Sequence, residues 1–125
     1  MLSASESIPV IKNVFHLTLV YNTGAAFGIF RSQSHLFIVV AVLSVFFILF
    51  LVTRKAHAFN SFEKTALYFI LGGTLGNLTD RLRLGHVIDF IDLRVWPVFN
   101  IADSFITVGA IMLALSIILR GRKRQ

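Results

Sequence analysis

The sequence contains no cysteine among its 125 residues. Disulfide bonds, thiolate catalysis and cysteine-based metal sites are therefore excluded. Charged residues are also scarce, at 14% of the chain, whereas soluble domains average about 25%. Hydrophobic residues make up 56%, and the mean hydropathy is +0.80. A soluble fold of this size could not bury so much apolar surface, so we expect residues 1–125 to form one integral membrane domain, mainly α-helical.

Acidic residues are half as numerous as basic ones, six against twelve, which leaves a net charge of +6. In a soluble protein this balance would suggest nucleic acid as a partner. Here the basic residues gather at the ends of hydrophobic segments, at Arg54 and Lys55 and again at residues 120–124. The positive-inside rule explains these clusters better, and we expect no nucleic-acid partner.

Three hydrophobic segments predict transmembrane helices at about residues 33–53, 63–81 and 102–119. The first contains no Asp, Glu, Lys or Arg. The second has a short apolar core and is expected to borrow turns from both flanks. Within it, Gly72 and Gly76 form a small-xxx-small pair that would let another helix approach closely.

The basic clusters also predict the orientation of the helices. They place the loop after residue 53 and the C-terminus in the cytoplasm. Residues 1–33 and the segment 80–103 then lie on the extracytoplasmic side, and the start of the chain has no signal-peptide pattern. Because no helix precedes residues 1–33 to carry them across, we expect the chain to be a shortened form of a four-helix protein.

Two segments have the character of β-strands. Residues 15–21 alternate apolar and polar side chains, and the turn signal Asn22-Thr23-Gly24 follows them. Residues 87–96 form a second β-prone stretch, which ends before Pro97. The orientation of the helices predicts that both segments lie at the outer face of the membrane.

Four of the six acidic residues lie in one window between two hydrophobic segments, at residues 80–103. Ionisable groups at membrane depth are costly, which makes them candidates for function. Two carboxylates in a partly dry site share one proton, so one can activate water while the other donates to a carbonyl oxygen, as in aspartic peptidases. The candidates are Asp80, Asp89, Asp92 and Asp103, with three asparagines in related segments, Asn22, Asn77 and Asn100.

Structural roles are the alternative for each of these acids taken singly, and for a single acid near the end of a span they are the better interpretation. The alternatives are helix capping for Asp103 with Asn100, and ion pairing for Asp92 with Arg94 and for Asp80 with Arg81 or Arg83. For four acids gathered with three asparagines, a functional site is the better interpretation.

Motifs of other chemistries are missing from the sequence. It has no Gly-x-Ser-x-Gly, no His-Glu-x-x-His and no phosphate-binding loop. The histidines have no ligand spacing and stand apart, at His16, His35, His57 and His86. We therefore expect neither a metal ion nor an organic cofactor.

Three segments together resemble the lipoprotein signal peptidase family, also called signal peptidase II. They are YNTGAAFG at residues 21–28, GGTLGNLTDRLRLGHVIDFID at 72–92 and FNIAD at 99–103. The resemblance implies a bacterial intramembrane aspartic endopeptidase, which removes signal peptides from diacylglyceryl-modified prolipoproteins by cutting just before the lipidated cysteine. It also implies four transmembrane helices, of which the first has no counterpart here, and a small extracytoplasmic β-cradle.

The resemblance also assigns roles to individual residues. Position alone favoured Asp80 and Asp103, both at the ends of predicted helices, whereas the family motifs make Asp89 and Asp103 the catalytic dyad. Asp92 is matched without a catalytic role. The polar supporting and substrate-binding positions fall on Asn22, Asn77, Asp80, Arg81 and Asn100.

The resemblance places the protein in the bacterial cytoplasmic (inner) membrane, with the active site outside and the C-terminus inside. The expected partners are a lipid-modified prolipoprotein substrate and membrane lipids, and we expect a monomer. Two alternatives stay open. One is a small non-catalytic subunit that uses buried acids for ion or proton passage, and the other is an inactive truncated homologue whose helices pack with a partner through Gly72 and Gly76.

Overall fold

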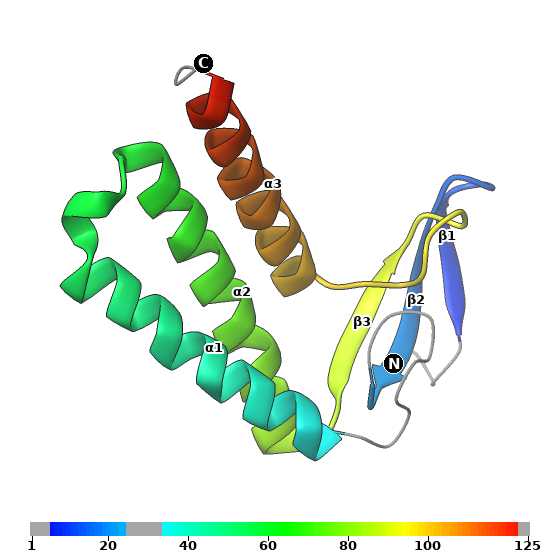
Figure 1. The fold of residues 1–125 in the computed structure, drawn as a ribbon. Helices are drawn as coiled ribbons and strands as arrows, with labels where there is room; N and C mark the ends of the chain where they lie inside the picture. The colour runs from blue at the N-terminus through cyan, green and yellow to red at the C-terminus, as the bar shows by residue number, and fades with distance from the viewer. Residues whose placement is uncertain (1–5, 25–33, 123–125) are drawn as a thin grey trace.

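The structure is a computed structural model that describes residues 6–24 and 34–122 (Figure 1). In these residues, helices pack side by side, and a small sheet lies at the end of the helical body where α1 begins and α2 ends. The elements in chain order are β1 (Ser7–Ile11), β2 (Phe15–Asn22), α1 (Ser34–Arg54), the 3-10 turn η2 (Ala56–Ala58), α2 (Ser61–Leu84), β3 (Val87–Asp92) and α3 (Ile101–Arg122).

Among the described helices, α1 and α3 are long and apolar enough to cross a membrane, with 21 and 22 residues. They overlap the predicted spans 33–53 and 102–119, although residue 33 lies outside the described residues. The predicted span 63–81 lies within α2, which extends beyond it at both ends. The result is a mainly helical membrane fold with two apolar helices and a small antiparallel sheet.

Local sequence signals fix both ends of α2. The Asn60 side chain accepts a hydrogen bond from the backbone N–H of Glu63, and the Glu63 carboxylate accepts one from the backbone N–H of Asn60. This reciprocal capping box satisfies two N–H groups that a helix start leaves unpaired. The helix ends at Leu84 and is capped by Gly85, whose φ of 78° is the left-handed conformation that glycine adopts without steric cost.

Glu63 also joins α2 to α3 at the end of the bundle away from the sheet. Its side chain is buried and accepts hydrogen bonds from Ser116 Oγ at 2.7 Å and from the Arg120 guanidinium at 2.8 Å. A buried carboxylate is stable only when its oxygens are satisfied in this way. The Glu63 contacts therefore fix how far α3 can slide along α2.

Two glycines bring α2 and α3 close together in the middle of the bundle. A methyl group added at Gly109 would lie 2.6 Å from the carbonyl oxygen of Ala66, and one added at Gly73 would overlap the carbonyl oxygen of Ala102. Because these carbonyl oxygens belong to the backbone, the two helices would have to move apart to make room for either methyl group. Small residues allow such close backbone approach between membrane helices.

Of the predicted close-packing pair, Gly76 is confirmed and Gly72 is wrong. At Gly72 an added methyl group would meet no atom of the described residues within 4 Å, whereas at Gly76 it would lie 3.2 Å from the Ala102 Cβ. The face that α2 turns toward α3 runs through Gly73, one residue further on. One residue is about 100° of helix rotation, so the contact with α3 falls on Gly73 and Gly76, which are three residues apart, and not on Gly72.

The sheet has the order β1-β2-β3 and is antiparallel throughout. The predicted strand at residues 15–21 is confirmed as β2, but the β-prone stretch 87–96 continues as a strand only to Asp92. It stops there because Arg94 has a φ of 65°, a left-handed conformation that leaves the extended chain. The sequence did not predict β1, whose Pro9 is tolerated on an edge strand.

We predict that Gly73→Ala destabilises the protein by about 1–3 kcal/mol, because the added methyl group overpacks the α2–α3 interface. Gly72→Ala is the matched control, with the same chemical change one residue away in open space. It should leave stability unchanged or raise it by up to about 1 kcal/mol through helix propensity. Thermal unfolding in detergent measures both variants. Equal effects of the two substitutions would contradict the close contact at Gly73.

Candidate active site

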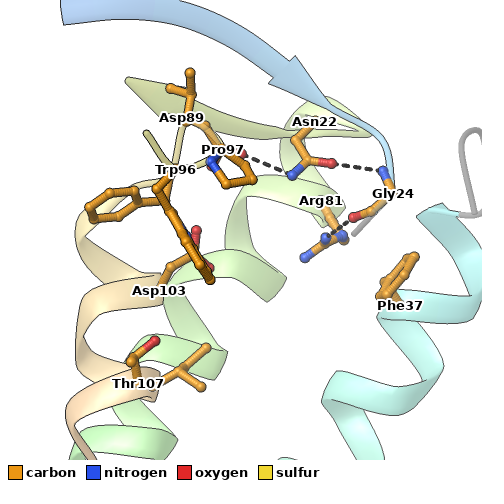
Figure 2. A pocket seen from close by; sticks show the side chains of 12 residues that line it. Asn22, Gly24, Phe37, Arg81, Asp89, Trp96, Pro97, Asp103 and Thr107 are labelled. Atoms are coloured by element: carbon orange, nitrogen blue, oxygen red, sulfur yellow. Dashed lines mark hydrogen bonds between the residues drawn. The ribbon is translucent and has the colours of Figure 1, made fainter. Parts of the chain in front are cut away.

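The sequence-predicted polar residues gather where the sheet meets the helices. A pocket of about 330 Å³ opens there, between the end of β2, the first turns of α1 and α3, and the last turns of α2 (Figure 2). Both acids of the expected dyad line it. The full set of lining residues is Asn22, Gly24, Phe37, Arg81, Asp89, Trp96, Pro97, Val98, Phe99, Asp103, Ile106 and Thr107.

Asp89 lies on β3 and is the most enclosed acid of the pocket, with 1% of its surface exposed. Its Oδ2 accepts a hydrogen bond from Asn22 Nδ2 at 2.9 Å, and its Oδ1 accepts one from Asn100 Nδ2 at 2.8 Å. Burial raises the pKa of the Asp89 carboxyl above its ordinary 3.8, and the negative charge of Asp103 raises it further. The two asparagine hydrogen bonds and the charge of Arg81 lower it, but burial prevails.

Asp103 stands in the first turn of α3, where it combines two roles. Its backbone N–H donates to Asn100 Oδ1 at 2.9 Å, and its Oδ2 accepts from the Asn100 backbone N–H at 3.2 Å. The structural alternative of helix capping is thus confirmed for this pair. Its other oxygen, Oδ1, accepts from Asn77 Nδ2 at 2.7 Å, so the same carboxylate also faces the pocket network.

Asn100 connects the two acids. Its buried side-chain amide donates both to Asp89 Oδ1 and to Asn77 Oδ1, at 2.8 and 3.0 Å. Its Oδ1 caps the helix that carries Asp103. One side chain therefore sets the separation of a strand carboxylate from a helix carboxylate.

Arg81 and Asp80, predicted as supporting residues, lie in different places. Arg81 lines the pocket and donates from Nη2 to the carbonyl oxygen of Gly24 at 3.0 Å. Asp80 does not line it, and its Oδ2 accepts from the backbone N–H of Ile88 at 3.4 Å, at the start of β3. No ion pair joins Asp80 to Arg81 or Arg83, all of which the structure describes, so that alternative is wrong.

Asp92 has the structural role predicted as its alternative. It forms an ion pair with Arg94 at 3.0 Å and accepts further hydrogen bonds from the Arg94 backbone N–H and from Thr18 Oγ1. Burial alone would raise the pKa of the Asp92 carboxyl, but the hydrogen bonds from Thr18 and Arg94 and the charge of Arg94 lower it below 3.8. Asp92 lies outside the lining of the pocket.

Several lining residues were not predicted from the sequence. Phe37, Ile106 and Thr107 sit in segments that read as membrane-spanning, where an apolar side chain is expected to face lipid. The motif residues 25–28 lie outside the described residues. Within residues 6–24 and 34–122, the acids and histidines form no group of three that could hold a metal ion.

Known proteins of one family match this chain over most of its length. A family model described as Signal peptidase (SPase) II matches residues 1–119. The lipoprotein signal peptidase of Halothermothrix orenii is 49% identical over 114 residues, which cover 91% of this chain and 77% of that protein. That of Clostridioides difficile strain 630 is 48% identical over 116 residues, covering 90% and 76%.

Solved structures show the same fold. Two bacterial membrane enzymes determined by the in meso method superpose with TM-scores of 0.91 and 0.82, at 29% and 30% identity. The matches cover 99% and 94% of this chain and 77% of each solved chain. The family resemblance inferred from three sequence segments is therefore confirmed.

We predict that Asn100→Asp makes stability depend on pH. An aspartate keeps the oxygen that caps α3 but replaces the nitrogen that donates to Asp89, so two carboxyls then face each other. The pKa of the pair rises in the folded state, and the unfolded state keeps the ordinary value. The free energy of unfolding therefore falls as the pH rises above 3.8, by at most about 1.4 kcal/mol per pH unit, and the stability present at low pH is lost.

Thermal unfolding of the detergent-solubilised variant between about pH 4 and about pH 7 measures this effect. Asn100→Ala is the control, because it loses the cap and the donor to Asp89 but adds no carboxyl. It should cost about 1 kcal/mol or more, and this cost should change less with pH than that of the aspartate variant. A loss in the aspartate variant that does not change with pH would show that Asn100 is not the donor to Asp89.

Proposed function

The chain belongs to the signal peptidase II family, and from that premise we propose that Asp89 and Asp103 are its catalytic dyad. As a lipoprotein signal peptidase it removes signal peptides from lipoproteins by aspartic-peptidase chemistry. The observation that carries the assignment of the dyad is the Asn100 amide, which binds Asp89 and also caps the turn that holds Asp103. No other acid lines the described pocket.

The substrate we propose is a diacylglyceryl-modified prolipoprotein, cut just before its lipidated cysteine. The family resemblance supports this substrate, and so does the surface beside the dyad. An apolar hollow of about 330 Å³ adjoins Asp103, lined by Leu93, Trp96, Phe99, Ser104, Thr107 and Val108. A substrate that carries its own lipid anchor would reach such a hollow by diffusion in the plane of the membrane.

In the proposed reaction Asp89 is the general acid, because it is the more enclosed of the two acids and burial raises its pKa. Asp103, acting as the general base, takes a proton from water while the water oxygen attacks the scissile carbonyl carbon. Asp89 donates its proton to the carbonyl oxygen, which gives a neutral tetrahedral diol. Asp103 then protonates the leaving nitrogen, the C–N bond breaks, and a diol proton returns to Asp89.

The supporting residues hold the two acids in this geometry, most of them through uncharged groups. Asn22, Asn77 and Asn100 donate neutral amide hydrogens to the two carboxylates, so they orient the acids without neutralising them. Arg81 supplies a positive charge beside the pocket. Asp80 supports the site from further away by holding the start of β3.

We further propose three transmembrane helices, α1, α2 and α3, in the bacterial cytoplasmic membrane, with residues 1–125 forming one domain. The sheet is then an extracytoplasmic β-cradle, and the C-terminus is cytoplasmic. The basic residues after α1 and at the end of α3 support this orientation. We propose that the protein acts as a monomer, because both acids of the proposed dyad come from the same chain.

Asp89→Asn and Asp103→Asn should each lower cleavage by about 10²–10⁴-fold or more, because each removes one of the two proton-transfer groups. A gel-shift assay on a diacylglyceryl-modified prolipoprotein measures the loss. Asp92→Asn is the matched control, on the same strand as Asp89 but outside the pocket, and should cleave normally per folded molecule. Full activity of Asp89→Asn would refute the dyad, and no cleavage by the unmutated chain would favour an inactive homologue.

Cleavage should also fall as the pH rises through the raised pKa of Asp89, since the reaction needs its proton. Asn22→Ala removes a hydrogen bond that lowers this pKa, so the alkaline limb of the pH–rate profile should move to higher pH. Thr18→Ala is the control, because Thr18 donates to Asp92 instead, and its limb should stay in place. An unmoved limb in the Asn22 variant would mean that Asp89 does not set it.

A further inference from the structure

The guanidinium of Arg81 is held between α1 and the turn that follows β2. Its Nη2 donates to the Gly24 carbonyl at 3.0 Å, and its Cζ lies 5.1 Å from the centre of the Phe37 ring. Figure 2 shows the ring facing Arg81 from α1. The Arg81 Nε is buried without a hydrogen-bond partner in the described residues. A cation over an aromatic face is a favourable arrangement, so the Phe37 ring takes part in fixing this side chain.

A line of contacts continues from Arg81 to the proposed catalytic acid (Figure 2). The backbone N–H of Gly24, whose carbonyl binds Arg81, donates to Asn22 Oδ1 at 2.9 Å. That bond fixes which end of the Asn22 amide is the oxygen, and the nitrogen at the other end donates to Asp89 Oδ2 at 2.9 Å. A shift of Arg81 would therefore loosen the turn that aims Asn22 at Asp89.

Among the described residues, helix α1 has one buried residue and contacts the turn after α2 through a hydrogen bond. Its one buried residue among those described is Ile48, about two-thirds of the way along the helix, and the nearby polar contact is Ser34 Oγ to the Gly85 carbonyl at 2.7 Å. Large apolar side chains further along α1 are exposed, including Phe46 at 68%. Phe37 is instead partly enclosed and lines the pocket.

We infer that Phe37 is a positioning residue for the peptidase reaction, holding Arg81 so that the Gly24–Asn22 turn keeps Asp89 in place. This role rests on the proposed dyad. Phe37 itself forms no bond to either acid and acts through Arg81. It also makes the docking of α1 against α2 a condition for an ordered site.

Phe37→Leu keeps an apolar side chain and removes the aromatic face, so kcat should fall about tenfold while KM changes by less than about twofold. The alkaline limb of the pH–rate profile should also move to higher pH, because the Asp89 pKa rises when Arg81 is displaced. The charges that act on Asp89 are Arg81 from α2 and Asp103 from α3, and a displaced Arg81 lowers the Asp89 pKa less. Phe37→Tyr keeps the ring and should restore both values. Phe46→Leu, the same change at an exposed site of α1, should alter neither.

A double-mutant cycle with Arg81→Lys tests whether Phe37 acts through Arg81. In the Arg81→Lys background, Phe37→Leu should lower kcat by less than about twofold, because the planar group that the ring holds is already gone. Phe37→Met is measured in parallel, so that a leucine variant that fails to fold leaves a second one. The substrate is a diacylglyceryl-modified prolipoprotein in detergent micelles.

Three results would overturn the inference. A raised KM with unchanged kcat would make Phe37 a substrate contact, equal losses in Phe37→Leu and Phe46→Leu would indicate general weakening of α1, and additive effects in the cycle would separate Phe37 from Arg81. Asp89→Asn and Asp103→Asn are run in the same assay. If they are inactive and the cycle is additive, only the role of Phe37 fails; if they are active, the dyad itself fails.

Discussion

Two acidic side chains held together away from bulk water are the constraint on which this end of the molecule depends. Removing a carboxylate from water costs several kcal/mol, and a second negative charge nearby adds to that cost. Neutral side-chain amides offset this cost: Asn22 and Asn100 donate to Asp89, and Asn77 donates to Asp103. An arginine in their place would stabilise both charges but would also fix both acids as ions. Neutral donors hold the acids in position and still allow one of them to keep a proton.

The helices supply the distances that this network needs. Gly73 of α2 lies against the backbone of Ala102, at the start of α3, and Asn77 stands one turn further along α2. Close approach at the glycine therefore brings the Asn77 amide within 2.7 Å of Asp103. At the far end, the buried Glu63 contacts stop α3 from sliding along α2. Packing that looks purely structural thus sets the geometry of the polar site.

The sequence predicted the helices and the identity of the polar residues well, because both leave local signals. Uncharged runs mark α1 and α3, and three motif segments mark the asparagines and acids. The sequence predicted less well which residues contact each other, because that depends on how segments far apart in the chain pack together. The close-packing glycine is Gly73 and not Gly72, and Asp80 binds a backbone N–H instead of an arginine. Phe37 carried no sequence signal, since a phenylalanine in an apolar run looks like any residue that faces lipid.

Asp89 and Asp92 show why residue type alone could not assign the roles. They lie three positions apart on the same short strand, and both are almost fully buried. Asp92 accepts hydrogen bonds from Thr18 and from the cationic Arg94, which lower its pKa and keep it ionised, so it has no proton to give. At Asp89 burial and the charge of Asp103 outweigh the hydrogen bonds from Asn22 and Asn100 and the charge of Arg81, which leaves the Asp89 pKa raised. Burial acts against ionisation at both carboxyls, and the balance with their partners therefore decides which of the two can take part in proton transfer.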